Sequence, residues 1–194
     1  MKHTEWIIHP SFYVFWAVWC LLDQSGYLWY FLLAALVHEL GHAAAVLACG
    51  GEIRRIILYA AGACIQVHHK KGYPADIGIA AAGPLAGLLM AILCTAVGWT
   101  NAAGASLLLT LFNCLPILPL DGGCIAACAL CMTPLGLRGY DGLRMVSMAG
   151  SAGLVVLGGV VLAETGTNAA LLTAGMTLFL GNAGYSCKAV GSCV

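Results

Sequence analysis

The residues of this chain best suited to chemistry are His38, Glu39 and His42, which lie within a run of apolar residues. On a helix, side chains four positions apart share one face, so both imidazoles could bind a single Zn2+ ion. Glu39 would be displaced by about 100° around the helix axis, beside the metal, where a general base for an attacking water belongs. The pattern H-E-x-x-H therefore indicates zinc-dependent hydrolysis.

A catalytic zinc ion takes three protein ligands and keeps one position open, so a third ligand is needed. Asp121 is the favoured candidate, because two prolines and two glycines interrupt the helix around this otherwise apolar segment. Such a stretch must face protein or a water-filled cavity, which would let Asp121 turn toward other spans. The alternative for Asp121 is a helix-capping or loop residue at the cytoplasmic end of the span. Four histidines are further candidates, although solvated positions at the membrane interface also explain them: His3, His9, His68 and His69.

The composition indicates a membrane protein. The chain has 194 residues, of which 61% are hydrophobic and only 8% are charged, whereas soluble domains carry about 25% charged residues. We therefore expect an all-α polytopic membrane protein, with residues 1–194 forming one intramembrane domain. No basic patch points to a nucleic acid partner.

Six apolar segments are candidates for transmembrane helices. The first could be a signal peptide, but no small-residue cleavage site follows it, so we interpret it as a retained span. Two short strands around a turn are expected between the second and third spans. The six segments are residues 8–22, 27–48, 76–98, 103–130 (with prolines inside), 143–163 and 168–186.

The six-span arrangement places every lysine and arginine on one side of the membrane. By the positive-inside rule this side is cytoplasmic, and both termini face it. His42 would then lie about 9 Å from the cytoplasmic end of the second span, in the cytoplasmic half of the bilayer. The basic residues are Lys2, Arg54, Arg55, Lys70, Lys71, Arg138, Arg144 and Lys188.

The polar stretch Gly51–Tyr73 between the second and third spans contains the two expected strands, Ile53–Tyr59 and Cys64–His68. Backbone with free edges must be buried in protein or face water, since lipid cannot satisfy it. Two interpretations remain open. The stretch is either a simple cytoplasmic hairpin or an edge that pairs with an extended substrate by strand addition.

Three of the ten cysteines, Cys124, Cys128 and Cys131, are spaced closely enough to raise the question of a metal cluster. No second Cys-x2-Cys pair at zinc-finger spacing accompanies them. Small packing residues within an apolar helix are the alternative interpretation.

The combination of His38-Glu-Leu-Gly-His42 with Asn113-x-Leu-Pro-x-x-Pro-Leu-Asp121-Gly-Gly resembles the site-2 protease family of intramembrane zinc metalloproteases, peptidase family M50. Ile8-His9-Pro10, the stretch from Gly51 to Leu58 and the six-span layout resemble its subgroup typified by stage IV sporulation protein FB. The resemblance covers nearly the whole chain.

The resemblance implies hydrolysis of a peptide bond in a membrane-associated protein, with His38, His42 and Asp121 as zinc ligands and Glu39 activating water. It also implies regulated intramembrane proteolysis in a bacterial cell membrane, for example of a transcription-factor precursor during sporulation, with regulatory membrane proteins as partners. No C-terminal nucleotide-sensing domain, as found in some relatives, is expected in this chain.

The chain departs from the family pattern at Gly87, where relatives often carry an asparagine that positions substrate. Asn113 is a candidate for a polar contact with substrate in its place. An ordinary interhelical hydrogen bond is the alternative for Asn113.

Two other functions compete with proteolysis. A non-proteolytic homologue that only binds membranes would have no use for a general base such as Glu39. A zinc transporter needs ligands along a route and often internal repeats, whereas here the ligands are expected to converge on one point and no repeat is evident.

Overall fold

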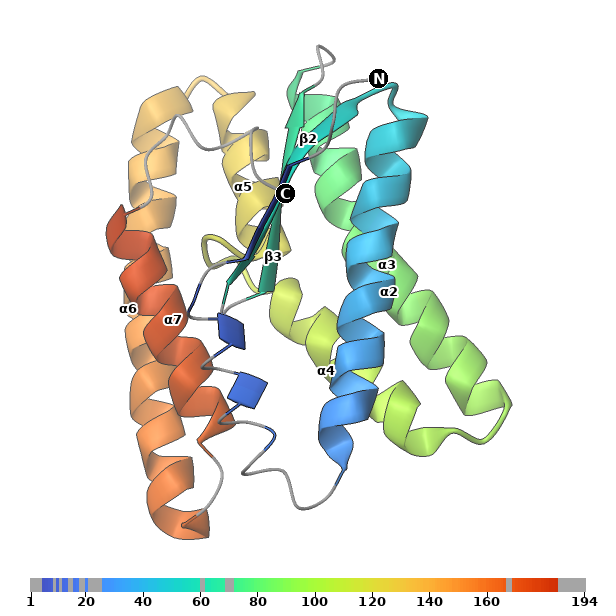
Figure 1. Ribbon diagram of the computed structural model, residues 1–194. Coiled ribbons are helices and arrows are strands. Elements are labelled where there is room, and N and C mark those ends of the chain that lie inside the picture. Colours follow the sequence, from blue (N-terminus) through green and yellow to red (C-terminus); the bar gives the residue numbers. More distant parts are fainter. Residues whose placement is uncertain are drawn as a thin grey trace.

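Six helices and three short strands form the part of the chain that the structure, a computed structural model, describes (Figure 1). The described residues are 5–8, 10, 12–13, 16–17, 20, 26–59, 62–68, 72–166 and 169–184. The helices are α2 (Tyr27–Ala48), α3 (Tyr73–Ala96), α4 (Thr100–Asn113), α5 (Asp121–Cys131), α6 (Gly136–Thr165) and α7 (Ala170–Gly184). The strands are β1 (Glu5–Ile8), β2 (Glu52–Tyr59) and β3 (Gly62–His68).

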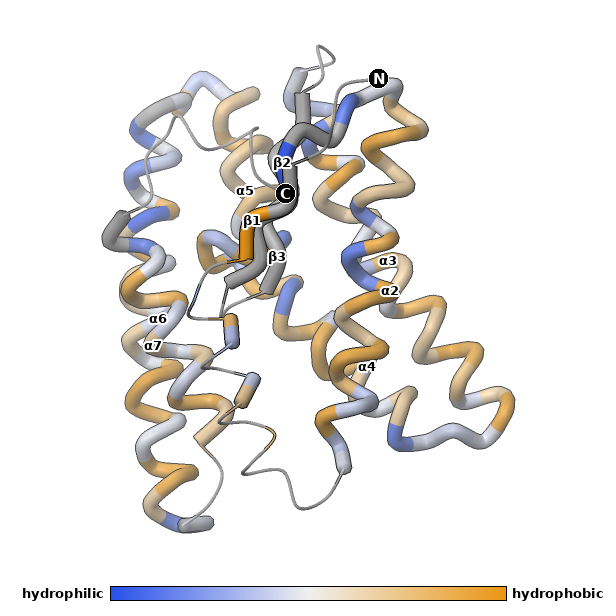
Figure 2. The backbone as a smooth tube through the Cα atoms, viewed as in Figure 1, coloured by the Kyte–Doolittle hydropathy of each residue, from blue (hydrophilic) through white to orange (hydrophobic). Residues whose placement is uncertain are grey.

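Three of these helices are long and apolar enough to cross a membrane: α2, α3 and the part of α6 from Arg138 to Thr165. They have 22, 24 and 28 residues, and a helix of about 20 residues spans the hydrocarbon core of a bilayer. Figure 2 shows apolar residues along most of each helix, with a short hydrophilic stretch midway along α2. The chain is therefore a membrane protein.

The segment 103–130, predicted as one span, is two helices. α4 ends at Asn113, and α5 begins only at Asp121. Proline has no amide hydrogen to donate within a helix, and Pro116 and Pro119 both lie in the connecting loop. With 11 residues, α5 is only about 16 Å long, well short of the hydrocarbon thickness.

The helices pack in a chain of neighbours. α2, α3 and α4 all pack against one another; α3 also packs against α5, α5 against α6, and α6 against α7. A Cβ atom at Gly41 would lie 2.6 Å from the backbone oxygen of Ala82 and 2.7 Å from Cβ of Ala86, so α2 and α3 approach too closely for any larger residue. Gly41 therefore permits this close approach of the two helices.

α6 and α7 form a second close pair. A Cβ at Gly158 would overlap the backbone of Leu172, and a Cβ at Gly175 would lie 2.8 Å from the backbone nitrogen of Val155. Small residues at these points let the two helices pack at short range, as is usual between membrane helices. In the view of Figure 1, this pair stands apart from α2, α3 and α4.

A three-stranded sheet in the order β1-β2-β3 joins the N-terminal residues to the segment between α2 and α3. β1 is parallel to β2, with Glu5 opposite Arg55, and β2 is antiparallel to β3, with Ile56 opposite Ile65. The sequence did not predict β1, whose last residue, Ile8, is the first residue of the predicted first span. Most of the segment 8–22 lies outside the described residues, so that span stays a prediction.

Candidate metal centre

Three side chains from two helices converge on one point. Nε2 of His38 and Nε2 of His42 are 3.2 Å apart on one face of α2. Asp121, the first residue of α5, places Oδ2 2.9 Å from His38 Nε2 and Oδ1 3.3 Å from His42 Nε2. All three side chains are buried, and their ligand atoms lie within 4.8 Å of one another. The structure thus brings together the three residues that the sequence singled out.

The donor set fits a zinc ion. Imidazole nitrogens and carboxylate oxygens are ordinary zinc ligands, and two ligands at about 2.0–2.1 Å from one tetrahedral ion are about 3.3 Å apart. The separation of the two Nε2 atoms, 3.2 Å, agrees with this spacing. Three protein donors leave a fourth position open, as catalytic sites require.

His42 is oriented by a hydrogen bond from α3. Its Nδ1 donates to the backbone oxygen of Ile79 at 2.8 Å. We assign the proton to Nδ1 because a carbonyl oxygen can only accept, which leaves the lone pair of Nε2 free for a metal. Pro84 lies inside α3 and cannot donate to the carbonyl of Ala80, so the helix is less regular beside this contact.

Gly83 on α3 makes room for the two imidazoles. A Cβ at this position would overlap Nε2 and Cε1 of His42, and would lie 2.9 Å from Nε2 of His38. A larger residue would therefore occupy the space in which the imidazoles meet.

Two glycines allow the loop before α5 to fold back over the first turn of the helix. A Cβ at Gly122 would overlap the backbone of Cys114, and a Cβ at Gly123 would lie 2.6 Å from the backbone nitrogen of Leu118. Asp121 is the acidic residue of the first turn, where the helix dipole favours negative charge. The loop and the Asp-Gly-Gly sequence together aim the carboxylate toward α2.

Glu39 lies beside the three donors. It is half-buried, and its carboxylate is near enough for its charge to interact with His42, His38 and Asp121. Its Oε2 is buried and has no hydrogen-bond partner among the described residues. A carboxylate without a fixed partner next to a metal-binding group is well placed to accept a proton.

The other candidates for a third ligand are not brought to this point. His3, His9 and His69 lie outside the described residues, and for His68 the structure describes only its backbone position in β3. The one group among the described residues that could hold a metal is made up of His38, His42 and Asp121.

Asn113 ends α4, and its amide donates to the backbone oxygen of Leu109 at 3.0 Å. This hydrogen bond lies within α4, so it is not the interhelical bond that the sequence left open. Contact of Asn113 with a substrate stays a prediction.

A side chain from α4 occupies the space beside Gly87. A Cβ at Gly87 would overlap Oγ1 of Thr110, and the Gly87 backbone oxygen accepts a hydrogen bond of 2.8 Å from Ser106. An asparagine at position 87 would therefore displace Thr110. This close approach of α4 gives a physical reason for the glycine.

The three closely spaced cysteines pack within α5. Cys128 is buried, Cys124 and Cys131 are partly exposed, and all three thiols are free. Among the described residues, no candidate metal group includes them. The packing interpretation is supported, and a metal cluster is not.

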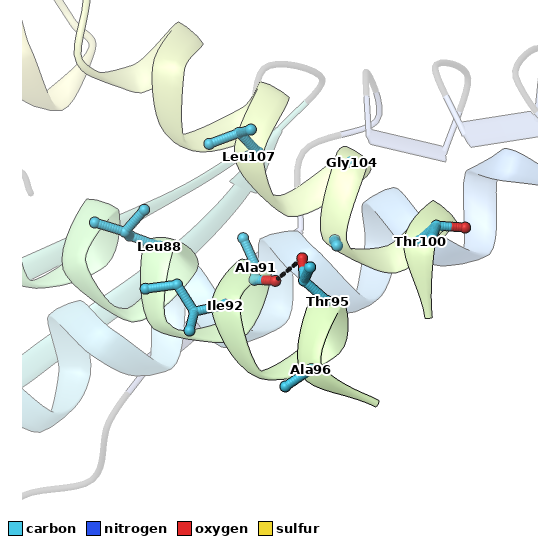
Figure 3. A pocket seen from close by; sticks show the side chains of 9 residues that line it. Leu88, Ala91, Ile92, Thr95, Ala96, Thr100, Gly104 and Leu107 are labelled. Atoms are coloured by element: carbon cyan, nitrogen blue, oxygen red, sulfur yellow. Dashed lines mark hydrogen bonds between the residues drawn. The ribbon is translucent and has the colours of Figure 1, made fainter. Parts of the chain in front are cut away.

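An apolar groove of about 590 Å³ lies between the end of α3 and the start of α4 (Figure 3). Its lining includes Leu88, Ile92, Gly104 and Leu107, and none of the three candidate metal ligands lines it. The groove is thus separate from the candidate metal centre.

Sequence reasoning missed two buried polar residues, Ser147 on α6 and Asn182 on α7, both with no exposed surface. Both hydrogen-bond to the backbone of Leu118 in the loop before Asp121. The available signal was the presence of serine and asparagine within apolar segments, since polar side chains in membrane helices usually contact another part of the protein.

Comparison with known proteins assigns the chain to a family. Residues 11–120, more than half of the chain, match the family described as Peptidase M50B-like. The chain belongs to the site-2 protease family. The matched region contains His38, Glu39 and His42 and ends one residue before Asp121.

Two known proteins are similar to this chain, over different shares of its length. Stage IV sporulation protein FB from Bacillus subtilis (strain 168) is 28% identical over 131 residues, which cover 60% of this chain and 44% of that protein. The match thus spans less than half of that relative's length. The solved structure of the site-2 protease from Methanocaldococcus jannaschii has the same fold, with a TM-score of 0.68 and 20% identity over 91% of this chain and 88% of that chain.

Proposed function

We propose that this chain is an intramembrane zinc endopeptidase that hydrolyses a peptide bond of a membrane-associated protein in the cytoplasmic half of the bilayer. The convergence of His38, His42 and Asp121 within 4.8 Å, with Glu39 beside them, carries this proposal. Ionisable side chains inside a membrane span are costly and mark functional sites. Membership of the site-2 protease family supports the same reaction.

Zinc held by His38, His42 and Asp121 would supply Lewis acidity, activating water and polarising the scissile carbonyl. Glu39 acts as the general base. It takes a proton from the attacking water as the oxygen–carbon bond forms, and then delivers that proton to the amine nitrogen as the carbon–nitrogen bond breaks. The Nδ1 hydrogen bond of His42 to Ile79, at 2.8 Å, holds the imidazole in the orientation that this site needs.

The charge pattern supports a cytoplasmic location for the site. His42 is six residues before the end of α2, or about 9 Å along the axis. This end leads into the segment that carries Arg54, Arg55, Lys70 and Lys71, and such residues favour the cytoplasmic side. We infer a multi-pass protein of a bacterial membrane with both termini in the cytoplasm.

The substrate is proposed to be a membrane-associated protein, such as a transcription-factor precursor, whose cleavage regulatory membrane proteins control. The sheet offers a means of holding it. Among the described strands, β2 pairs with both β1 and β3, which leaves the outer edges of β1 and β3 as candidates for pairing with an extended segment.

Zinc transport is less well supported. Transport requires donors along a route through the membrane, whereas the described residues offer one group of three donors. A membrane-binding role without proteolysis does not explain why Oε2 of Glu39 is buried with no hydrogen-bond partner among the described residues.

Replacement of Glu39 by glutamine tests the proposal. Glutamine keeps the size of the side chain but cannot accept the proton, so Glu39→Gln should bind zinc as the wild type does and lose cleavage by at least about a hundredfold. The inactive variant is also used to capture the substrate, which is identified by mass spectrometry. This substrate is then co-expressed with each variant to measure cleavage.

The matched control is Glu164→Gln, which removes an exposed carboxylate at the end of α6 and should leave cleavage unchanged. Full proteolysis of the captured substrate by Glu39→Gln would contradict the mechanism.

A further inference from the structure

The loop that carries Asp121 toward α2 is held by two polar side chains far along the chain. The backbone N–H of Leu118 donates to Oγ of Ser147 on α6 at 3.0 Å. Nδ2 of Asn182 on α7 donates to the backbone oxygen of Leu118 at 2.6 Å. Ser147, Asn182 and Leu118 are all fully buried, with exposed fractions of 0%.

The loop needs these hydrogen bonds because no helix satisfies its backbone. Leu118 lies between the end of α4 and the start of α5, and Pro119 has no amide hydrogen to offer. An unpaired backbone group at membrane depth is strongly disfavoured, since no lipid group can replace the missing partner.

The donor groups of both side chains are fully engaged. The Ser147 hydroxyl donates to the backbone oxygen of Leu143 at 2.8 Å while it accepts from Leu118. The second hydrogen of the Asn182 amide is used toward the backbone oxygen of Leu178 at 3.1 Å. Each side chain is therefore fixed to its own helix and to the loop at the same time.

Contacts lead from Leu118 to the metal-binding carboxylate. A Cβ at Gly123 would lie 2.6 Å from the backbone nitrogen of Leu118, so the loop rests directly on the first turn of α5. The backbone N–H of Leu120 donates to Ile117 at 2.8 Å. A shift of Leu118 would therefore move the first turn of α5, which begins with Asp121.

We propose that Ser147 and Asn182 are positioning residues that set the location of Asp121 through Leu118 and so determine how tightly the site binds zinc. This inference rests on the proposed function, because it takes Asp121 to be a zinc ligand. Neither residue touches the reacting atoms. We refer to Ser147 and Asn182 as the anchoring pair.

The experiment measures metal binding by the full chain in detergent or nanodiscs. Ser147→Ala removes the hydroxyl, and Asn182→Leu keeps a similar size but removes the amide. Each variant is titrated with Zn2+ against a chromophoric chelator, and with Co2+, whose visible spectrum reports the coordination geometry. Loss of an outer partner of a metal ligand weakens binding by about 10–100-fold. Because the anchoring pair contacts Leu118 and not Asp121 itself, we expect the Zn2+ dissociation constant to rise by about tenfold, the lower end of this range, with altered Co2+ bands.

Ser151→Ala is the matched control. Ser151 lies one turn along α6, is equally buried, and donates only to the backbone oxygens of Ser147 and Met148 on its own helix. It should leave Zn2+ affinity and the Co2+ spectrum unchanged, while thermal unfolding shows how far each substitution destabilises the fold. Both changes free the same backbone segment, so their effects should not add. The double variant should therefore have nearly the same Zn2+ affinity as the single variant that binds Zn2+ more weakly.

Wild-type affinity and spectra in Ser147→Ala and Asn182→Leu would overturn the inference, as would an equal loss of affinity in Ser151→Ala. If the wild-type chain binds neither Zn2+ nor Co2+, the proposed function fails together with this inference. If the wild type binds zinc and cleaves its substrate while the anchoring pair proves dispensable, this inference alone fails.

Discussion

At the scale of single residues, the site combines groups that a membrane protein has no structural reason to bury. His38, His42 and Asp121 have exposed fractions of 5%, 2% and 8%, and two of their contacts are shorter than 3.3 Å. A buried carboxylate between two imidazoles is removed from water and needs a partner of opposite charge. In the proposed zinc site, a divalent cation would supply that charge.

Asp121→Ala should lower the zinc content of the purified protein, because it removes one of three donors. Atomic absorption measures the bound metal. Asp141→Ala, which removes an exposed carboxylate on α6, should leave the content unchanged. Equal zinc in the wild type and Asp121→Ala would exclude Asp121 from the ligand set.

Gly83→Ala should weaken zinc binding by about tenfold or more, as expected when the orientation of a ligand is disturbed. The new methyl group would overlap the His42 imidazole, which the bond to Ile79 restrains. Gly78→Ala is the matched control, because a Cβ there meets no atom within 4 Å. Chelator competition compares the two variants, and equal affinities would show that the imidazole can move aside at no cost.

At the scale of elements, glycines set the distances between helices. Gly41 allows α2 to contact α3 at short range, and Gly158 allows the same for α6 and α7. Lipid chains are as apolar as leucine, so close packing and hydrogen bonds hold membrane helices together. The glycines at which a Cβ does not fit are therefore the positions that determine how closely each pair of helices packs.

Gly158→Ala should destabilise the protein by about 1–3 kcal/mol, the usual cost of overpacking, because its methyl group would overlap the backbone of Leu172. Gly159→Ala adds the same atoms to the next residue, where a Cβ has no neighbour within 4 Å. Thermal unfolding in detergent should separate the two variants. Equal melting temperatures would mean that α7 shifts freely.

Local patterns in the sequence were enough to single out the three residues that the structure brings together as a candidate metal-binding group. The four-residue spacing of His38 and His42 predicts that both side chains share one face of a helix. The prolines and glycines around Asp121 predict a break in the helix. The pairing of β1 with β2 was not predictable, because Glu5 lies opposite Arg55 and no local pattern specifies a parallel partner so distant. The roles of Ser147 and Asn182 depend on a similarly remote backbone contact.

At the scale of the whole molecule, the charges define a direction across the membrane. In the predicted six-span arrangement, the basic residues would all fall on one side, while Asp23 and Glu164 would fall on the other. The positive-inside rule orients such proteins. The proposed location of the site in the cytoplasmic half depends on this orientation.

Labelling with a membrane-impermeant reagent that reacts with amines tests the orientation of the chain across the membrane. The native lysines, Lys2, Lys70, Lys71 and Lys188, should react in inside-out vesicles and be protected in right-side-out vesicles. Thr100→Lys, at the exposed start of α4, should show the opposite behaviour. Peptide mass spectrometry reads the labelled positions, and reaction of native lysines from both sides would contradict the six-span orientation.

The two histidines and the aspartate enter the membrane at different times during synthesis. α2 emerges from the ribosome first, Asp121 follows only with α5, and Asn182 arrives with α7. A nascent chain that has inserted α2 and α3 alone has two of the three donors and cannot form the complete site. The proposed hydrolytic site is therefore completed only after most of this chain has been made.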